Sequence, residues 1–129
     1  MISYGFTKEL DIPYGKAIDL VRESLKKEGF GVLTEINVHE IMKEKLGVDM
    51  NKYIILGACN PPNAYKAILA EENIGLLLPC NVIVYEKGSK TVLSIIRPMV
   101  AMQMVDNVGL QKISEEVEGK LKKSFDAIK

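Results

Sequence analysis

The chain has 129 residues, of which 47% are hydrophobic and 26% are charged, a composition typical of folded globular proteins rather than disordered ones. Its 17 Lys and Arg residues balance its 17 Asp and Glu residues, so the formal net charge is zero. Because nucleic-acid partners require a clustered basic surface, we predict none for this chain. We expect residues 1–129 to form one domain.

The sequence also argues against secretion and membrane insertion. The first nine residues contain neither a basic region nor an apolar run, and no later stretch reaches the roughly 18 apolar residues of a spanning helix. Two cysteines are too few for a disulfide framework. These features predict a cytoplasmic protein with reduced thiols and no membrane partner.

The first predicted elements are a strand over residues 1–10 and a helix that begins at Pro13. Proline favours the first helical position, because its missing N–H has no partner there in any case. Gly29 is placed to end this helix in the αL conformation. The helix is expected to cover a sheet.

A second strand is predicted over residues 30–36, which are rich in β-branched and apolar side chains. Asn37 and Glu40 then have the spacing of a capping box, in which each side chain bonds a backbone N–H of the other. A short helix should follow and end at Gly47.

A buried strand is predicted over residues 52–59. After it, Asn60 can cap a helix and Pro61 can begin it, with its end near Glu72. This arrangement would place the thiol of Cys59 close to a helix N-terminus.

The last part of the chain predicts an antiparallel strand pair and a closing helix. One strand is expected over residues 74–86, with an interruption at Pro79, and a tight turn leads from it into a strand over residues 91–96. From Asp106 onward, apolar residues recur at helical spacing. The order of elements predicts an α+β fold: a two-layer sandwich in which helices pack on a mixed β-sheet of about five strands.

Two Cys-Asn dipeptides mark the candidate site. They contain both cysteines of the chain, and each lies where an apolar run meets residues that break or cap secondary structure. We therefore expect both thiols at strand ends, bordering a small polar pocket in an apolar wall. The two Cys-Asn segments consist of Cys59, Asn60, Pro61, Pro79, Cys80 and Asn81.

The thiols allow two opposite interpretations. A helix N-terminus favours a thiolate, which would make Cys59 a nucleophile and Cys80 a resolving thiol. Alternatively, both are small buried hydrophobic side chains, since free cysteine is among the most buried residue types.

A metal site is a further possibility, because thiolates bind Zn²⁺ or Cu⁺ and His39 would supply a third ligand. The spacing gives this little support, since the chain has no C-x-x-C motif and a single histidine. His39 is better interpreted as an exposed residue in the first turn of the short helix. No cofactor is assigned.

Segments at consecutive positions give the sequence a specific resemblance to a known family. They are residues 29–36, 43–47, 55–62 and 74–82. With these segments, nearly the whole chain resembles the prokaryotic family described as domain of unknown function 302. The resemblance implies a two-layer α/β fold and a homodimer, and it carries no established activity, substrate or catalytic residue.

Other positions follow from the resemblance. Glu35 and Lys45 fall on family segments, and they join the two Cys-Asn segments as candidate ligand-binding residues. From their own chemistry, a strand glutamate and a helix lysine are more often surface groups than a general base and a cation. Arg97 departs from the family pattern, which has an acidic residue before Pro98; a role of that acid in ligand binding is either lost here or reversed in charge preference.

These observations favour a cytoplasmic homodimer that binds a small ligand or metal at the two Cys-Asn segments without turnover of its own. A thiol-dependent redox enzyme or sensor that uses Cys59 and Cys80 is the first alternative. A purely structural interaction module is the second. The sequence does not decide whether the protein is an enzyme.

Overall fold

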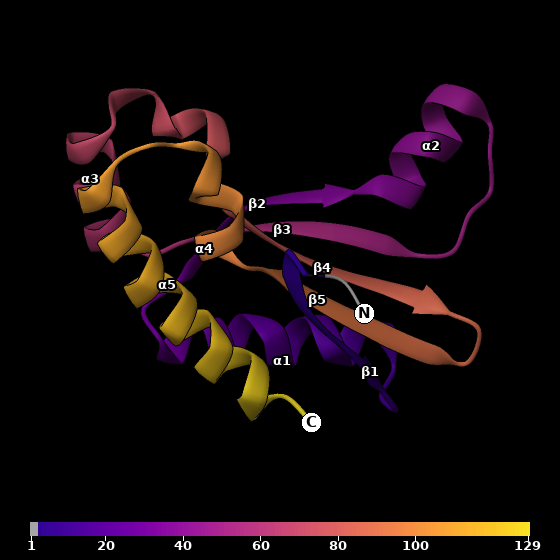
Figure 1. The fold of residues 1–129 in the computed structure, drawn as a ribbon. Helices are drawn as coiled ribbons and strands as arrows, with labels where there is room; N and C mark the ends of the chain where they lie inside the picture. The colour runs from indigo at the N-terminus through magenta and orange to yellow at the C-terminus, as the bar shows by residue number, and fades with distance from the viewer. Residues whose placement is uncertain (1–2) are drawn as a thin grey trace.

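The computed structural model describes residues 3–129, and in this range five strands form one antiparallel sheet in the order β1-β5-β4-β3-β2 (Figure 1). The strands are β1 (Gly5–Leu10), β2 (Gly31–Asn37), β3 (Tyr53–Cys59), β4 (Cys80–Lys87) and β5 (Lys90–Ile96). The predicted α+β class is therefore confirmed. The predicted mixed sheet is wrong in one respect, because every neighbouring pair is antiparallel.

The helices explain why the pairs are antiparallel. They are α1 (Tyr14–Lys27), α2 (Val38–Leu46), α3 (Pro61–Ala70), the 3₁₀ helix η1 (Glu72–Leu77), α4 (Pro98–Ala101), the 3₁₀ helix η2 (Met102–Met104) and α5 (Val108–Ala127). α2 and α3 lie beside the ends of the strands that they connect (Figure 1). A parallel pair needs a connection that crosses the sheet, so a chain that turns back at the strand end gives an antiparallel neighbour.

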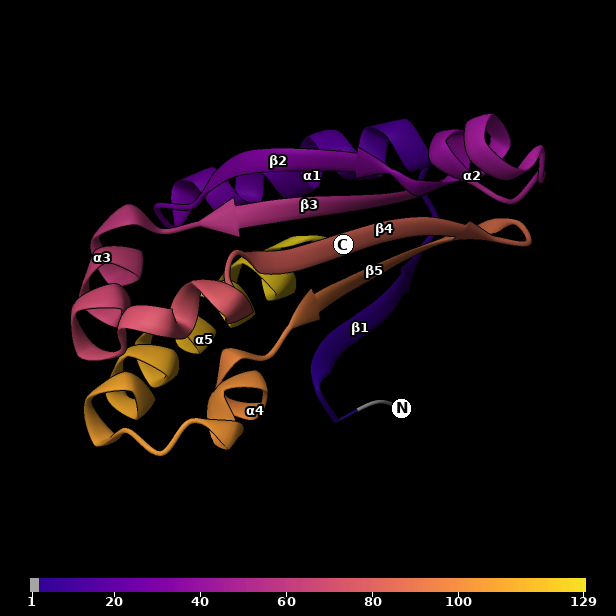
Figure 2. The same ribbon diagram turned by 90° about the horizontal axis from the view of Figure 1, so that it is seen from above.

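The helices cover one face of the sheet. α1 and α5 lie on the far side of the strands in Figure 2, while α3, η1 and α4 gather at one end of the sheet. Over residues 3–129, no helix covers the other face (Figure 2). No helix in that same range is both long and apolar enough to span a bilayer.

The core lies between the sheet and the pair α1 and α5. It is built from fully buried side chains of both layers, among them Leu25, Leu56, Leu93 and Leu121. Where α1 crosses α5, the Ser24 hydroxyl donates to the Ser124 carbonyl oxygen at 2.8 Å, and the Ser124 hydroxyl donates back to the Ser24 carbonyl oxygen at 3.1 Å. These small side chains satisfy each other in the core, where an unpaired hydroxyl would be costly.

Most of the predicted helix ends are confirmed, but Pro13 is the N-cap of α1, which begins one residue later than predicted, at Tyr14. Gly29 has φ +84° after α1, and Asn60 caps α3 by accepting a hydrogen bond from the Asn63 N–H. The predicted capping box at Asn37 is wrong, since the Asn37 side chain makes no capping hydrogen bond. The Asn37 backbone is still paired with Ile54 as the last residue of β2, and α2 follows directly.

Two predicted boundaries are also wrong. The predicted helix to Glu72 ends at Ala70, and residues 72–77, part of which was predicted as strand, form η1. The sheet register gives the reason, because Ala58 pairs with Cys80 and β3 ends one residue later. A strand before Cys80 would have no neighbour to pair with. The first predicted strand begins at Gly5, and its residues 1–2 lie outside the described range.

Candidate functional site

A cavity of about 390 Å³ opens where β3 ends and β4 begins. We call it the strand-end cavity. Its walls come from these two strand ends, from the start of β2 and the residues around it, and from α3, η1 and one side of α5. Leu33 and Ile68 line it and are 68% and 44% exposed, so the cavity reaches the surface between β2 and α3. Its volume lies within the range of small-molecule sites.

Both cysteines lie at strand ends, as predicted, and both line the strand-end cavity. Cys59 is the last residue of β3 and Cys80 is the first residue of β4. Burial raises the pKa of the Cys59 thiol, and burial together with the neighbouring Cys59 raises the pKa of Cys80 to about 11. Both groups are therefore neutral thiols near pH 7, and both are free.

Only part of the two Cys-Asn segments lies at the cavity. Cys59, Asn60, Pro79 and Cys80 line the strand-end cavity, whereas Pro61 and Asn81 do not. Asn81 pairs with Gly57 and lies on the uncovered face of the sheet. The reason is the alternation of side chains along a strand, which sends residues 80 and 81 to opposite faces.

Gly57 makes the close packing at this end of the sheet possible. A Cβ at Gly57 would collide with the Thr34 side chain and would approach Cγ of Pro79 to 2.7 Å. The absence of a side chain lets Thr34 and Pro79, both of which line the strand-end cavity, lie against the β3 backbone.

Asn60 joins three parts of the structure. Its Nδ2 donates to the carbonyl oxygens of Glu28 and Gly29, at 3.4 and 3.3 Å, and its Oδ1 accepts hydrogen bonds from Asn63. The side chain therefore connects the end of α1 with the beginning of α3 next to the cavity. Asn60 is buried, and these contacts give it a structural role in holding the wall.

The N-terminus of α3 is already satisfied. Pro61 and Pro62 have no N–H, the Asn63 N–H bonds Oδ1 of Asn60, and the Ala64 N–H bonds the Asn60 carbonyl oxygen. A helix N-terminus binds anions through free N–H groups. The first four residues of α3 have no free N–H group for this purpose. None of the described residues that line the strand-end cavity is charged. The cavity thus suits a neutral molecule.

Of the three side chains considered for a metal site, Cys59 and Cys80 line the same cavity, but His39 lies far from them. His39 lies at the opposite end of β3, where its Nδ1 accepts a hydrogen bond from the Tyr53 N–H at 3.0 Å. The six steps from Tyr53 to Cys59 correspond to about 20 Å of extended strand. His39 is also half-buried rather than exposed. Within residues 3–129, no group of three His, Cys, Asp or Glu side chains could hold a metal ion.

Glu35 and Lys45 lie away from the strand-end cavity. Glu35 projects from β2 toward α1, where it forms an ion pair with Arg22 at the surface. Lys45 is exposed on α2. Both positions agree with the interpretation of these residues as surface groups.

Comparison with known proteins identifies the family. The family model "Domain of unknown function DUF302" matches residues 6–128. The chain belongs to the DUF302 family. One structure that it resembles is the crystal structure of an uncharacterized conserved DUF302 protein from Bacillus stearothermophilus, which is 29% identical, has a TM-score of 0.92, and aligns over 99% of this chain and 100% of that one. A search of curated proteins finds no match.

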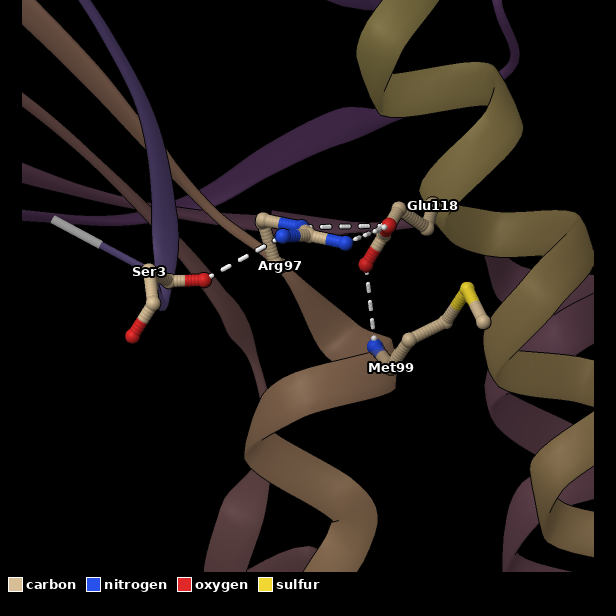
Figure 3. A network of polar contacts seen from close by, with 4 residues as sticks. All are labelled: Ser3, Arg97, Met99 and Glu118. Atoms are coloured by element: carbon tan, nitrogen blue, oxygen red, sulfur yellow. Dashed lines mark hydrogen bonds and ion pairs between the residues drawn. The ribbon is translucent and has the colours of Figure 1, made fainter. Parts of the chain in front are cut away.

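Arg97, where this DUF302 chain departs from the expected acidic residue, is held by Glu118 on α5 (Figure 3). Its Nε and one terminal nitrogen donate to Oε2 of Glu118 at 3.2 and 3.1 Å, and the other terminal nitrogen donates to the Ser3 carbonyl oxygen. Oε1 of Glu118 accepts the Met99 N–H at the start of α4. Arg97 does not line the strand-end cavity, so its contacts are structural.

Sequence reasoning missed most of the apolar wall of the DUF302 cavity. Phe30 and Met102 are buried and line it, as does Ile113 on α5. The helical spacing marks Ile113 as an inward-facing residue, but it does not distinguish a closed core from a cavity wall. Asn63 was also missed, although a polar residue in the first turn of a mostly apolar helix was the one available signal.

Proposed function

We propose that this DUF302 domain binds a small, neutral and predominantly apolar molecule in the strand-end cavity. The observation that carries the proposal is a cavity of about 390 Å³ whose described lining residues include no charged side chain. Ligand sites are typically concave and mostly apolar, with a few polar groups that orient the ligand. The exposed Leu33 and Ile68 at its mouth provide an apolar route from the surface.

The thiols support binding rather than chemistry. Cysteine reactivity depends on the thiolate, and burial shifts both pKa values away from thiolate formation near neutral pH. The redox alternative, with Cys59 attacking and Cys80 resolving, therefore has less support. In the proposal, the two thiols are polarisable parts of an apolar wall. Their free state also supports the proposed cytoplasmic location.

A fluorescence titration with N-phenyl-1-naphthylamine tests the proposal, because this neutral probe brightens when it leaves water. The chain has no tryptophan to interfere. We expect saturable binding to the wild-type protein. The variant Ala64→Leu, which adds bulk at a half-buried wall residue, should lose most of this binding. The control Lys66→Leu, an exposed site on the same helix that does not line the cavity, should keep it.

Two results would contradict the proposal. One is the absence of saturable binding to the wild-type protein. The other is equal binding by Ala64→Leu and the wild-type protein when circular dichroism shows that both are folded, since the probe would then occupy another place.

We further propose that the uncovered face of the sheet forms a homodimer with a second copy of the chain. On this face the rings of Tyr53 and Tyr85 stack with their centroids 5.2 Å apart, and Ile83 and Ile96 line the same hollow of about 550 Å³. The described residues that line this hollow include no charged side chain. Aromatic side chains are enriched at the centres of interfaces, from which charged residues are depleted, and such a surface can meet its own copy by two-fold symmetry.

Light scattering coupled to size exclusion tests the dimer. We expect the mass of a dimer for the wild-type protein and of a monomer for Ile83→Lys, because a lysine at the centre of the interface would be desolvated without a partner. Leu46→Lys, an exposed site on α2, is the control and should remain dimeric. A monomeric wild-type protein would overturn this second proposal without affecting the first.

A further inference from the structure

Asn63 places an unused hydrogen-bond acceptor at the strand-end cavity. It lies in the first turn of α3, lines the cavity and is only 4% exposed. Its Oδ1 is buried and has no hydrogen-bond partner among the described residues. Buried polar atoms in folded proteins are nearly always paired, because an unpaired one costs free energy.

The neighbouring contacts determine which end of the Asn63 amide is the unpaired one. Oδ1 of Asn60 is identified by the hydrogen bond that it accepts from the Asn63 backbone N–H at 3.3 Å. The atom of Asn63 that lies 3.0 Å from this same oxygen must therefore be a donor, which is Nδ2. The remaining atom of the Asn63 amide is the oxygen, an acceptor without a partner in the described structure.

Two other polar side chains at the cavity, those of Ser114 and Asn60, are already engaged. The Ser114 hydroxyl donates to the Leu110 carbonyl oxygen at 3.0 Å, and the Asn60 Nδ2 donates to the end of α1. The N–H groups of Asn63 and Ala64 in the first turn of α3 are bonded to Asn60. The buried side-chain atom at the cavity that has no partner among the described residues is therefore an acceptor, and it calls for a ligand with a donor.

We propose that the ligand is a neutral molecule with an apolar body and one O–H or N–H group, and that this group donates a hydrogen bond to Oδ1 of Asn63. The inference rests on the proposed function and narrows the class of ligand. Neutral alcohols, phenols and amides with an N–H group belong to this class. Carboxylates and phosphates do not, because the cavity offers them no cation and no free helix N–H.

Competition between two matched compounds tests the inference. 1-Decanol and 1-fluorodecane have nearly the same shape, but only the alcohol has a donor. Each is titrated against bound N-phenyl-1-naphthylamine, and the ratio of the two dissociation constants is compared between protein variants. Using this ratio removes the difference in hydration of the two compounds, since that difference is the same for every variant.

We expect Asn63→Leu to shift the ratio against the alcohol by about five- to tenfold, the usual effect of one neutral hydrogen bond. Asn63→Ala should shift it in the same direction, and it serves as a second variant if leucine disturbs the wall. Both variants keep the backbone N–H of residue 63, which donates a hydrogen bond to Oδ1 of Asn60. Lys66→Leu, at an exposed position of the same helix that does not line the cavity, is the control and should leave the ratio unchanged.

The outcomes separate this inference from the proposed function. If both compounds displace the probe but the ratio is the same in wild type, Asn63→Leu and Asn63→Ala, the donor contact to Asn63 is overturned and the apolar cavity stands. If the probe itself fails to bind the wild-type protein, the proposed function falls, and the inference falls with it.

Discussion

Cys59 and Cys80 lie one step out of register on neighbouring strands. Cys80 is opposite Ala58, so Cys59 lies one residue beyond the direct partner position. Successive side chains of a strand point to opposite faces, so the register directs the Cα–Cβ bonds of these two residues to opposite sides of the sheet, although both side chains line the strand-end cavity. A disulfide requires Cβ atoms that point toward each other.

We therefore expect mild oxidation with diamide to leave the two thiols of one chain unlinked. Intact-mass measurement after alkylation would show two alkylated cysteines in the oxidised sample, as in the reduced one. Loss of both alkylation sites in a folded monomer would mean that the sulfurs meet, and it would restore the redox alternative.

The buried thiol of Cys80 makes stability depend on alkaline pH. Its pKa is raised from 9.0 to about 11, first by burial and then by Cys59, so the unfolded chain loses this proton at lower pH than the folded one. The contribution is complete below pH 9 and is lost between pH 9 and pH 11. At about 1.4 kcal/mol per pKa unit, the free energy of unfolding should fall by about 2–3 kcal/mol across this range.

Urea unfolding at a series of pH values measures this loss. Tyrosines also titrate in the same range, so the comparison with Cys80→Ala is essential. The variant should be less stable at pH 7 but should lose less stability from pH 9 to pH 11. Parallel curves for the two proteins would show that Cys80 is not the titrating group.

Gly57 should tolerate no side chain. In Gly57→Ala the new methyl group would press on Thr34 and Pro79, and overpacking of this kind costs about 1–3 kcal/mol. Gly119 gives the opposite case, since it lies within α5 with open space around its Cα. Gly119→Ala should raise stability by up to about 1 kcal/mol through helix propensity. Thermal unfolding that ranks the two variants in the reverse order would contradict the described packing.

Arg97 and Glu118 should behave as a coupled pair. Arg97→Leu leaves the buried carboxylate of Glu118 without its cation. Because the Arg97 side chain is 34% exposed, the cost should lie below the roughly 3–5 kcal/mol of a fully buried pair. The double variant Arg97→Leu/Glu118→Leu should be less destabilised than Arg97→Leu alone. Chemical denaturation provides the free energies. Additive effects of the two substitutions would mean that the pair is not coupled.

The contact between Arg97 and Glu118 is an example of a feature that could not be predicted from the sequence. Arg97 and Glu118 are 21 positions apart, and only the packing of α5 beside the end of β5 brings them together. Local patterns did predict the thiols at strand ends and Asn60 as the cap of α3, because each depends on a few adjacent residues. The extent of β4 was not predictable in this way, since it depends on where β3 stops pairing.

The strand-end cavity depends on long-range packing as well. Cys59 and Cys80 mark its position in the sequence, yet its far wall comes from Met102 and α5. Asn81 adjoins Cys80 in the sequence but lies on the opposite face. The sequence therefore predicted the strand-end residues of the cavity, whereas its other walls could be recognised only in the folded structure.

The most direct test of the strand-end cavity is a methyl NMR titration. Protein labelled at the methionine methyl groups is titrated with 1-decanol, and the signals of Met102, which lines the cavity, and Met104, which does not and is 76% exposed, are followed. We predict a saturable shift of the Met102 signal while that of Met104 stays nearly constant. An unchanged Met102 signal, or equal shifts of both signals, would contradict the assignment of this cavity as the binding site.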